Sequence, residues 1–121
     1  MASILLSEAD PDVRRLLVVL LERIGHTAIV LDGGIDVPPS ADLLVLEPSS
    51  AIRLNQARVA RELDPTLPIV SVSALPAAGR FLTRGPLSYL PKPFTFEQLH
   101  TTIEAALSPV SRTSHAAGPP A

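Results

Sequence analysis

The chain contains no cysteine and no tryptophan, and Lys92 is its single lysine. The absence of cysteine excludes disulfides, thiolate chemistry and cysteine-ligated zinc. Aromatic residues are limited to one tyrosine and three phenylalanines, and the formal net charge is −2. A chain with few aromatic side chains and no basic excess lacks the usual features of a nucleic-acid-binding surface.

Long apolar runs are also missing. No hydrophobic run approaches the roughly 20 residues that span a bilayer, and the Met-Ala-Ser-Ile-Leu-Leu start lacks the positive charge of a signal peptide. We therefore expect a cytoplasmic protein without membrane contact. Apolar residues make up 46% of the 121 residues, which predicts one globular domain. We assign this domain to residues 1–107 and expect the Ser-, Ala-, Gly- and Pro-rich residues 108–121 to form a flexible tail.

The segment 41–47, Ala-Asp-Leu-Leu-Val-Leu-Glu, carries the clearest strand signal. Its apolar run shows no polar alternation, which is typical of a strand buried on both faces of a parallel sheet. Similar short runs predict four further strands, at residues 4–7, 27–31, 68–73 and 87–90.

Three helices are predicted, two between strands, over residues 11–24 and 51–63, and one after the last strand, over residues 96–107. Asp10 followed by proline is a strong helix start, and Gly25 is a suitable helix end. Ser49 or Ser50 can cap the second helix, and Thr95 with Gln98 forms a capping box for the third.

Apolar spacing predicts which side of each helix faces the core. The residues predicted to face inward are Val13, Leu17, Leu20, Leu21 and Ile24 in the first helix, Ile52, Val59 and Leu63 in the second, and Phe96, Leu99, Ile103, Ala106 and Leu107 in the third. Val18 and Val19 lie off the inward face of the first helix. They are either ordinary surface valines or part of a stripe that binds a partner.

Strands that alternate with helices predict a doubly wound α/β fold. We expect a five-stranded parallel sheet in the flavodoxin-like order 2-1-3-4-5. The residues between Gly34 and Ala41 include two prolines and are too few for a regular second helix, which we expect to be lost or reduced to a turn. Residues 77–83 can form at most a short helix.

Polar side chains follow four of the five strands, at the sheet edge where ligands bind in such folds. These polar residues are Glu8, Asp10, Glu47, Ser73 and Lys92, and the apolar Ala9 lies between the two acids after the first strand. This series resembles the receiver domain of bacterial two-component response regulators, over residues 4–107. The closest motif is Tyr-Leu-Pro-Lys-Pro-Phe at 89–94, followed by Ile-Val-Ser-Val-Ser-Ala at 69–74.

The resemblance implies a role for each position. In receiver domains the acid after the third strand is an aspartate that accepts a phosphoryl group, and two acids after the first strand hold Mg²⁺. A hydroxyl and a lysine, here Ser73 and Lys92, contact the phosphoryl oxygens. An aromatic side chain, here Tyr89, turns inward on activation. The resemblance also implies a cis peptide bond between Lys92 and Pro93.

The chain departs from this pattern at two positions. Glu47 replaces the aspartate, and its longer side chain moves the carboxylate by roughly 1.5 Å, which misplaces a nucleophile. Ala9 replaces the second acid, leaving Glu8. Asp10 could take that place, but it already serves as the predicted helix cap. Because Mg²⁺ needs near-octahedral oxygen coordination, we expect the metal site to be lost. We expect Glu47 to bond Lys92, directly or through one water, and so imitate part of the phosphorylated state.

These observations predict an atypical receiver that is not an enzyme, needs no cofactor and acts as a bacterial protein-interaction module. Its expected partners are a histidine kinase or an output or regulatory protein, and a homodimer is one option. Two alternatives remain open. One is a receiver that is weakly phosphorylated on Glu47 or binds metal through Glu8, Asp10 and Glu47, and the other is a small-molecule sensor that uses the same pocket.

Overall fold

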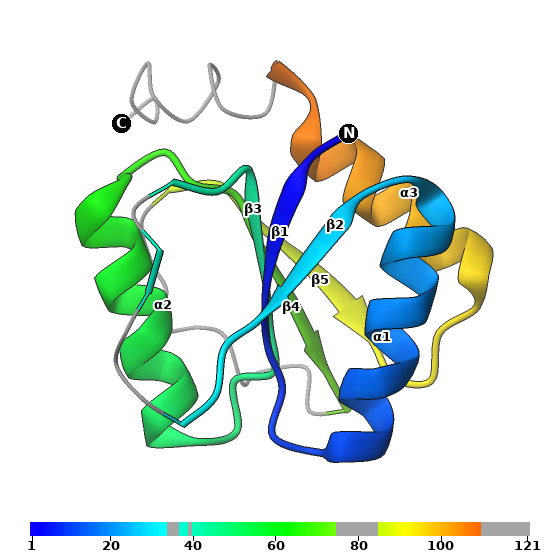
Figure 1. The fold of residues 1–121 in the computed structure, drawn as a ribbon, viewed down its shortest axis with the longest axis horizontal. Helices are drawn as coiled ribbons and strands as arrows, with labels where there is room; N and C mark the ends of the chain where they lie inside the picture. The colour runs from blue at the N-terminus through cyan, green and yellow to red at the C-terminus, as the bar shows by residue number, and fades with distance from the viewer. Residues whose placement is uncertain (34–36, 39, 75–84, 110–121) are drawn as a thin grey trace.

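A computed structural model describes residues 1–33, 37–38, 40–74 and 85–109. Within them, five strands form one parallel sheet in the order β2-β1-β3-β4-β5 (Figure 1). The strands are β1 (Ser3–Ser7), β2 (Thr27–Val30), β3 (Leu43–Leu46), β4 (Ile69–Ser73) and β5 (Leu87–Pro91). The predicted fold class and strand order are confirmed.

Three helices cover this sheet in the described residues, and they match the predicted ranges. They are α1 (Pro11–Ile24), α2 (Ala51–Leu63) and α3 (Phe96–Leu107). Figure 1 shows α1 and α3 against one face of the sheet and α2 against the other. None of these helices is long and apolar enough to cross a membrane.

The central strands are buried on both faces, as their continuous apolar runs predict. Ile4 and Leu6 of β1 pack in a cluster with Leu17 of α1 and Ile103 of α3. Leu5, between them in the strand, points the other way and packs in the cluster that includes α2. The side-chain period of two therefore divides one apolar run between two cores.

The predicted helix ends are also present. The Asp10 carboxylate accepts hydrogen bonds from the backbone N–H groups of Asp12 and Val13, at 2.9 and 3.3 Å. Gly25 ends α1 with a φ of 105°, a conformation that favours glycine. Thr95 and Gln98 form both bonds of the capping box at the start of α3.

The predicted inward face of α2 is wrong. Ile52 and Leu63 are 55% and 50% exposed, and the buried residues are Arg53, Gln56, Ala57 and Ala60. The polar members can be buried because the backbone that follows β2 supplies hydrogen-bond acceptors for them. Arg53 Nη1 donates to the Leu31 carbonyl at 2.7 Å, and Gln56 Nε2 donates to the Asp32 carbonyl.

One prediction for α3 also needs correction. Its buried residues are Leu99, Ile103 and Ala106, as predicted, but Phe96 is 38% exposed. Phe96 is the first residue of α3, and Arg23 of α1 lies over its ring, 5.3 Å from the centroid. The ring is therefore partly covered by a cationic side chain at the surface and does not enter the core.

Some expectations fall wholly or partly outside the described residues. Described residues 31–33, 37–38 and 40 contain no helix, and residues 34–36 and 39 of the same segment are not described. The short helix expected over 77–83 and most of the expected tail, residues 110–121, also lie outside the described residues.

Arg61 of α2 joins the beginnings of β4 and β5. Its guanidinium donates to the carbonyl of Leu67 at 2.7 Å and to the carbonyl of Pro86. Burial lowers the pKa of Arg61 to about 10, while the Asp64 carboxylate opposes this shift. The group is thus charged at neutral pH, and its hydrogen bonds offset part of the cost of burying the charge. A side chain on Gly85, which has a φ of 82°, would collide with this guanidinium.

We expect Gly85→Ala to lower the free energy of unfolding by about 1–3 kcal/mol, because it adds a positive-φ penalty and displaces Arg61. Gly33→Ala is the matched control, since Gly33 has no positive φ and no atom within 4 Å of an added Cβ. That variant should stay within about 0.5 kcal/mol of the wild type in urea unfolding. Equal effects of the two substitutions would contradict the prediction.

Candidate functional site

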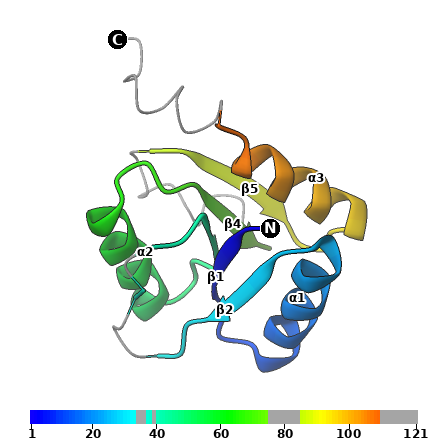
Figure 2. The same cartoon turned by 45° about the horizontal axis from the view of Figure 1, so that its top comes forward.

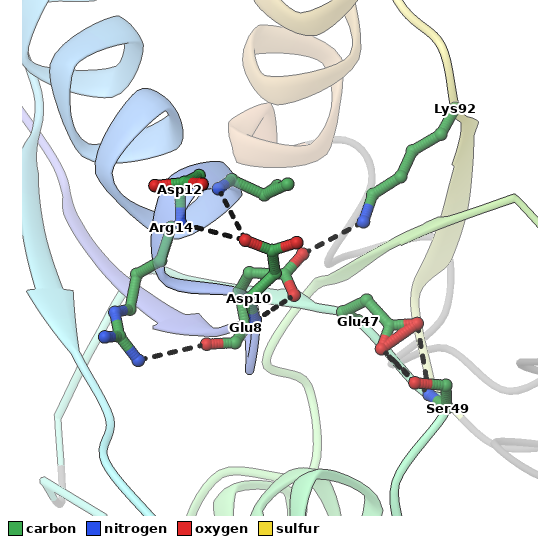
Figure 3. Close-up of polar contacts among 8 residues, drawn as sticks. Glu8, Asp10, Asp12, Arg14, Glu47, Ser49 and Lys92 are labelled. Atoms are coloured by element: carbon green, nitrogen blue, oxygen red, sulfur yellow. Dashed lines mark hydrogen bonds and ion pairs between the residues drawn. The ribbon is translucent and has the colours of Figure 1, made fainter.

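The candidate site lies where the carboxyl ends of the strands meet at one edge of the sheet. Glu8 follows β1, Glu47 follows β3, Ser73 ends β4 and Lys92 follows β5. Parallel pairing places all of these ends on the same side of the molecule. Figure 3 shows that the Lys92 side chain extends from its strand toward Glu8. Residues up to 84 positions apart in the sequence are thus brought together.

Glu8 is the buried carboxylate of the site, with 2% of the residue exposed. Its Oε1 accepts a hydrogen bond from Lys92 Nζ at 3.0 Å, and its Oε2 accepts one from the backbone N–H of Asp10 at 3.0 Å (Figure 3). Both oxygens of Glu8 are therefore engaged by donors from the protein. The loop after β1 is held as well, because Arg14 Nη1 donates to the Glu8 carbonyl at 3.4 Å.

Lys92 reaches Glu8 from the end of β5, the outermost strand on one side of the strand order. Its backbone N–H donates to the carbonyl of Ser73 at 3.0 Å, which continues the pairing of β4 with β5. The peptide bond from Lys92 to Pro93 is cis, as predicted. The Lys92 side chain is 25% exposed and that of Glu8 only 3%, so the ion pair is largely shielded from water.

The predicted bond between Glu47 and Lys92 is not formed. Both carboxylate oxygens of Glu47 accept from the backbone N–H of Ser49 at 3.2 Å, and the Ser49 hydroxyl donates to Oε2 (Figure 3). The physical reason is competition for one cation. Glu47 is only half-buried and finds donors two residues away, whereas the buried Glu8 carboxylate has the greater need for a positive charge.

The remaining acidic position, Asp10, has a structural role. Its carboxylate is exposed and caps α1, as predicted. The neighbouring Ala9 is also exposed and has no oxygen in its side chain. No group of three His, Cys, Asp or Glu side chains within the described residues is arranged to hold a metal ion. Glu8 is bound to the Lys92 ammonium, and the Ala9 side chain offers no oxygen ligand to a cation.

The two other predicted site residues lie on β4 and β5. Ser73 is 9% exposed at the end of β4, close to the Lys92 backbone. Tyr89 is 49% exposed, so its ring is not enclosed by the described residues. The structure brings Glu8, Ser73 and Lys92 together but leaves Glu47 bound to its own loop.

Sequence reasoning missed a polar network beneath the site. The hydroxyl of Ser7, the last residue of β1, donates to Gln56 Oε1 at 2.5 Å. Arg53 lies beside Gln56 and bonds the backbone that follows β2. The signal available in the sequence was the pair of polar residues three positions apart in a helix. Such a pair usually indicates a solvent-exposed side and not a buried one.

The Glu8–Lys92 pair leads to a double-mutant prediction. Lys92→Met should lower the free energy of unfolding by about 2–3 kcal/mol, because it leaves the buried Glu8 carboxylate without a cation. Adding Glu8→Gln should recover part of this loss, with a coupling energy of about 0.5–3 kcal/mol measured by urea unfolding.

Glu47→Gln is the matched control, since it neutralises a carboxylate in the same pocket that does not bond Lys92. Its effect should add to that of Lys92→Met within about 0.5 kcal/mol. Strong coupling of Glu47, with none for Glu8, would show that the lysine pairs with the other acid in solution.

Comparisons with known proteins find the same fold elsewhere. A response regulator receiver protein from Sinorhizobium medicae has a TM-score of 0.74 and 24% identity, covering 87% of this chain and 93% of that one. NtrX from Brucella abortus has a TM-score of 0.76 and 24% identity, over 96% of this chain and 28% of NtrX. The receiver domain of the sensor histidine kinase PA1611 from Pseudomonas aeruginosa has a TM-score of 0.71 and 21% identity, over 88% and 97%.

These likenesses concern the three-dimensional arrangement much more than the sequence. No family model and no curated protein matches the chain. Three features nevertheless agree with the resemblance noted from the sequence. They are the strand order, the presence of helices on both faces of the sheet and the position of the lysine after β5. The chain therefore has the five-stranded parallel fold of response regulator receiver domains.

Proposed function

We propose that this chain is an atypical receiver domain of bacterial signal transduction. It acts in the cytoplasm as a protein-interaction module and is not an enzyme. In this proposal it is not switched by phosphorylation of an aspartate in the presence of Mg²⁺. The observation that carries the proposal is the ion pair between buried Glu8 and Lys92, at 3.0 Å. It joins the one acid left at the metal position to the lysine that would contact a phosphoryl group.

The charges at the site support this proposal. A divalent cation would have to compete with the Lys92 ammonium for Glu8, and Ala9 offers no second carboxylate. Without a metal, the negative charge of an incoming phosphoryl group has one fewer cation to stabilise it. The PA1611 receiver domain, in contrast, was crystallised with a magnesium ion coordinated in its active site cleft.

The position of Glu47 supports the same conclusion. A nucleophile must be free and aligned with the group it attacks. The Glu47 carboxylate instead accepts three hydrogen bonds from Ser49, two from the backbone and one from the hydroxyl. Attack on a phosphoryl donor would require these bonds to break before the carboxylate could turn toward the pocket.

The surface is then the means by which the domain signals. A receiver that does not change its charge state can still present a shaped surface to a histidine kinase or to an output or regulatory protein. In this proposal the ion pair holds the site in one arrangement, and binding of the partner does not depend on phosphoryl transfer.

Restoring the missing acids tests the proposal directly. The wild type and the Ala9→Asp/Glu47→Asp variant would be incubated with acetyl phosphate and Mg²⁺ and followed by intact-protein mass spectrometry. We expect no phosphoryl adduct on the wild type and an adduct on the double variant, because the variant regains a carboxylate at position 9 for the metal and has a shorter nucleophile at position 47.

Ala9→Asp/Glu47→Asn is the matched control, since it keeps the added metal ligand and lacks the nucleophile. An adduct on the wild type that maps to Glu47 would overturn the proposal in favour of a weakly phosphorylated receiver. Sub-millimolar Mg²⁺ binding by the wild type in calorimetry, lost in Glu8→Gln, would favour a metal-binding receiver instead.

A further inference from the structure

The outer face of α1 carries a stripe of two large apolar side chains, Leu16 and Val19, which are neighbours on the helix surface. Leu16 and Val19 are 51% and 56% exposed, and they lie one helical turn apart. On α2 the exposed residues Ile52 and Leu63 are at opposite ends of the helix, so they form no continuous stripe. Figure 2 shows α1 at the outside of the molecule, beside β2 and α3.

The apolar surface extends toward the start of α3. Leu16 lines a groove of about 450 Å³ together with Leu20 and Phe96, and this groove is mainly apolar. Phe96 is itself 38% exposed. A contiguous patch of this kind on a soluble domain is typical of a surface that binds another protein.

Four charged residues border the stripe. Asp12 and Arg15 lie near the start of α1, with side chains 89% and 76% exposed. Glu22 and Arg23, also exposed, lie near its end. Successive helix residues are rotated by about 100°, so Arg15 and Glu22 lie on one side of Val19, with Arg23 on the other. Each end of the stripe therefore carries one acid and one base.

This distribution matches itself under a two-fold rotation. A two-fold axis perpendicular to α1, level with Val18, places a second α1 antiparallel to the first. The side of one helix that carries Arg15 and Glu22 then lies next to the same side of the other helix. Arg15 then faces the partner subunit's Glu22, and Asp12 faces the partner subunit's Arg23. Each contact occurs twice. A parallel arrangement would exchange the two sides of the α1 face, so Arg15 would no longer face the partner subunit's Glu22.

We propose that the α1 face binds a second copy of this chain, with the two α1 helices antiparallel. Leu16 packs against the partner subunit's Val19 in the centre, and the four charge pairs surround this contact. We choose a second copy as the partner because the four charges of the α1 face are complementary to the same four charges on another copy. A different protein would not need to carry this pattern. The proposal concerns assembly and does not depend on the Glu8–Lys92 pair.

The size of α1 sets the expected strength. A helix of 14 residues is about 21 Å long, so its contact is at the small end of protein interfaces. The dimer should therefore be reversible and depend on concentration, and added salt should weaken it because its charge pairs are exposed.

Sedimentation equilibrium of the full chain and its charge variants at low salt tests this arrangement. Arg15→Glu and Glu22→Arg each create two like-charge contacts and should weaken dimerisation about tenfold. The double variant Arg15→Glu/Glu22→Arg exchanges the charges and should restore it. A mixture of the two single variants should form a heterodimer, since the Glu at position 15 of one chain faces the Arg at position 22 of the other.

Val19→Lys should abolish dimerisation, and circular dichroism should show an unchanged fold because Val19 is exposed. Arg58→Glu on α2 is the control for a change of charge away from α1, and it should dimerise like the wild type. A wild-type chain that stays monomeric up to its solubility limit would overturn the proposal. Failure of the charge exchange to restore a dimer weakened by the single changes would also overturn it.

Discussion

The buried carboxylate of Glu8 requires a nearby positive charge, and several residues at this edge of the sheet are positioned by that requirement. Glu8 is carried by β1, the second strand of the sheet, and its cation comes from Lys92 after β5, at the far edge. Parallel pairing of the intervening strands brings these ends to one side of the molecule. The pair thus joins the first strand of the chain to the last. The stabilisation from this ion pair depends on formation of the sheet, because neither charge is shielded from water until the strands have paired.

Several other polar groups near this pair are hydrogen-bonded within the protein. Ser7 bonds Gln56 beneath the site, and Arg53 bonds the backbone after β2. Glu47 accepts hydrogen bonds from its own loop. The Glu8 and Glu47 carboxylates thus both accept hydrogen bonds from groups of the protein itself.

The helix α1 links this internal arrangement to the surface. Its capping residue, Asp10, also donates its backbone N–H to Glu8, so the start of the helix is held by the site. Its inner face contributes Leu17 and Leu21 to the core, while Leu16 and Val19 remain outside. The start and the inner face of α1 are therefore held by the rest of the domain, while Leu16 and Val19 lie at the surface.

Local interactions made most of the fold predictable. Continuous apolar runs are typical of buried parallel strands, and caps such as Asp10-Pro11 and Thr95 with Gln98 define helix starts through bonds only two or three residues long. The positions of the site residues followed as well, because a residue after a parallel strand lies at the same edge as its counterparts.

What the sequence could not decide was the choice between partners. Lys92 could have paired with either of two acids, and either side of α2 could have faced the sheet. These choices depend on how deeply each group is buried and on which backbone carbonyls lie near it. Burial and such long-range contacts exist only after the strands and helices have packed, so the tertiary structure alone assigned Lys92 to Glu8 and buried Arg53 and Gln56.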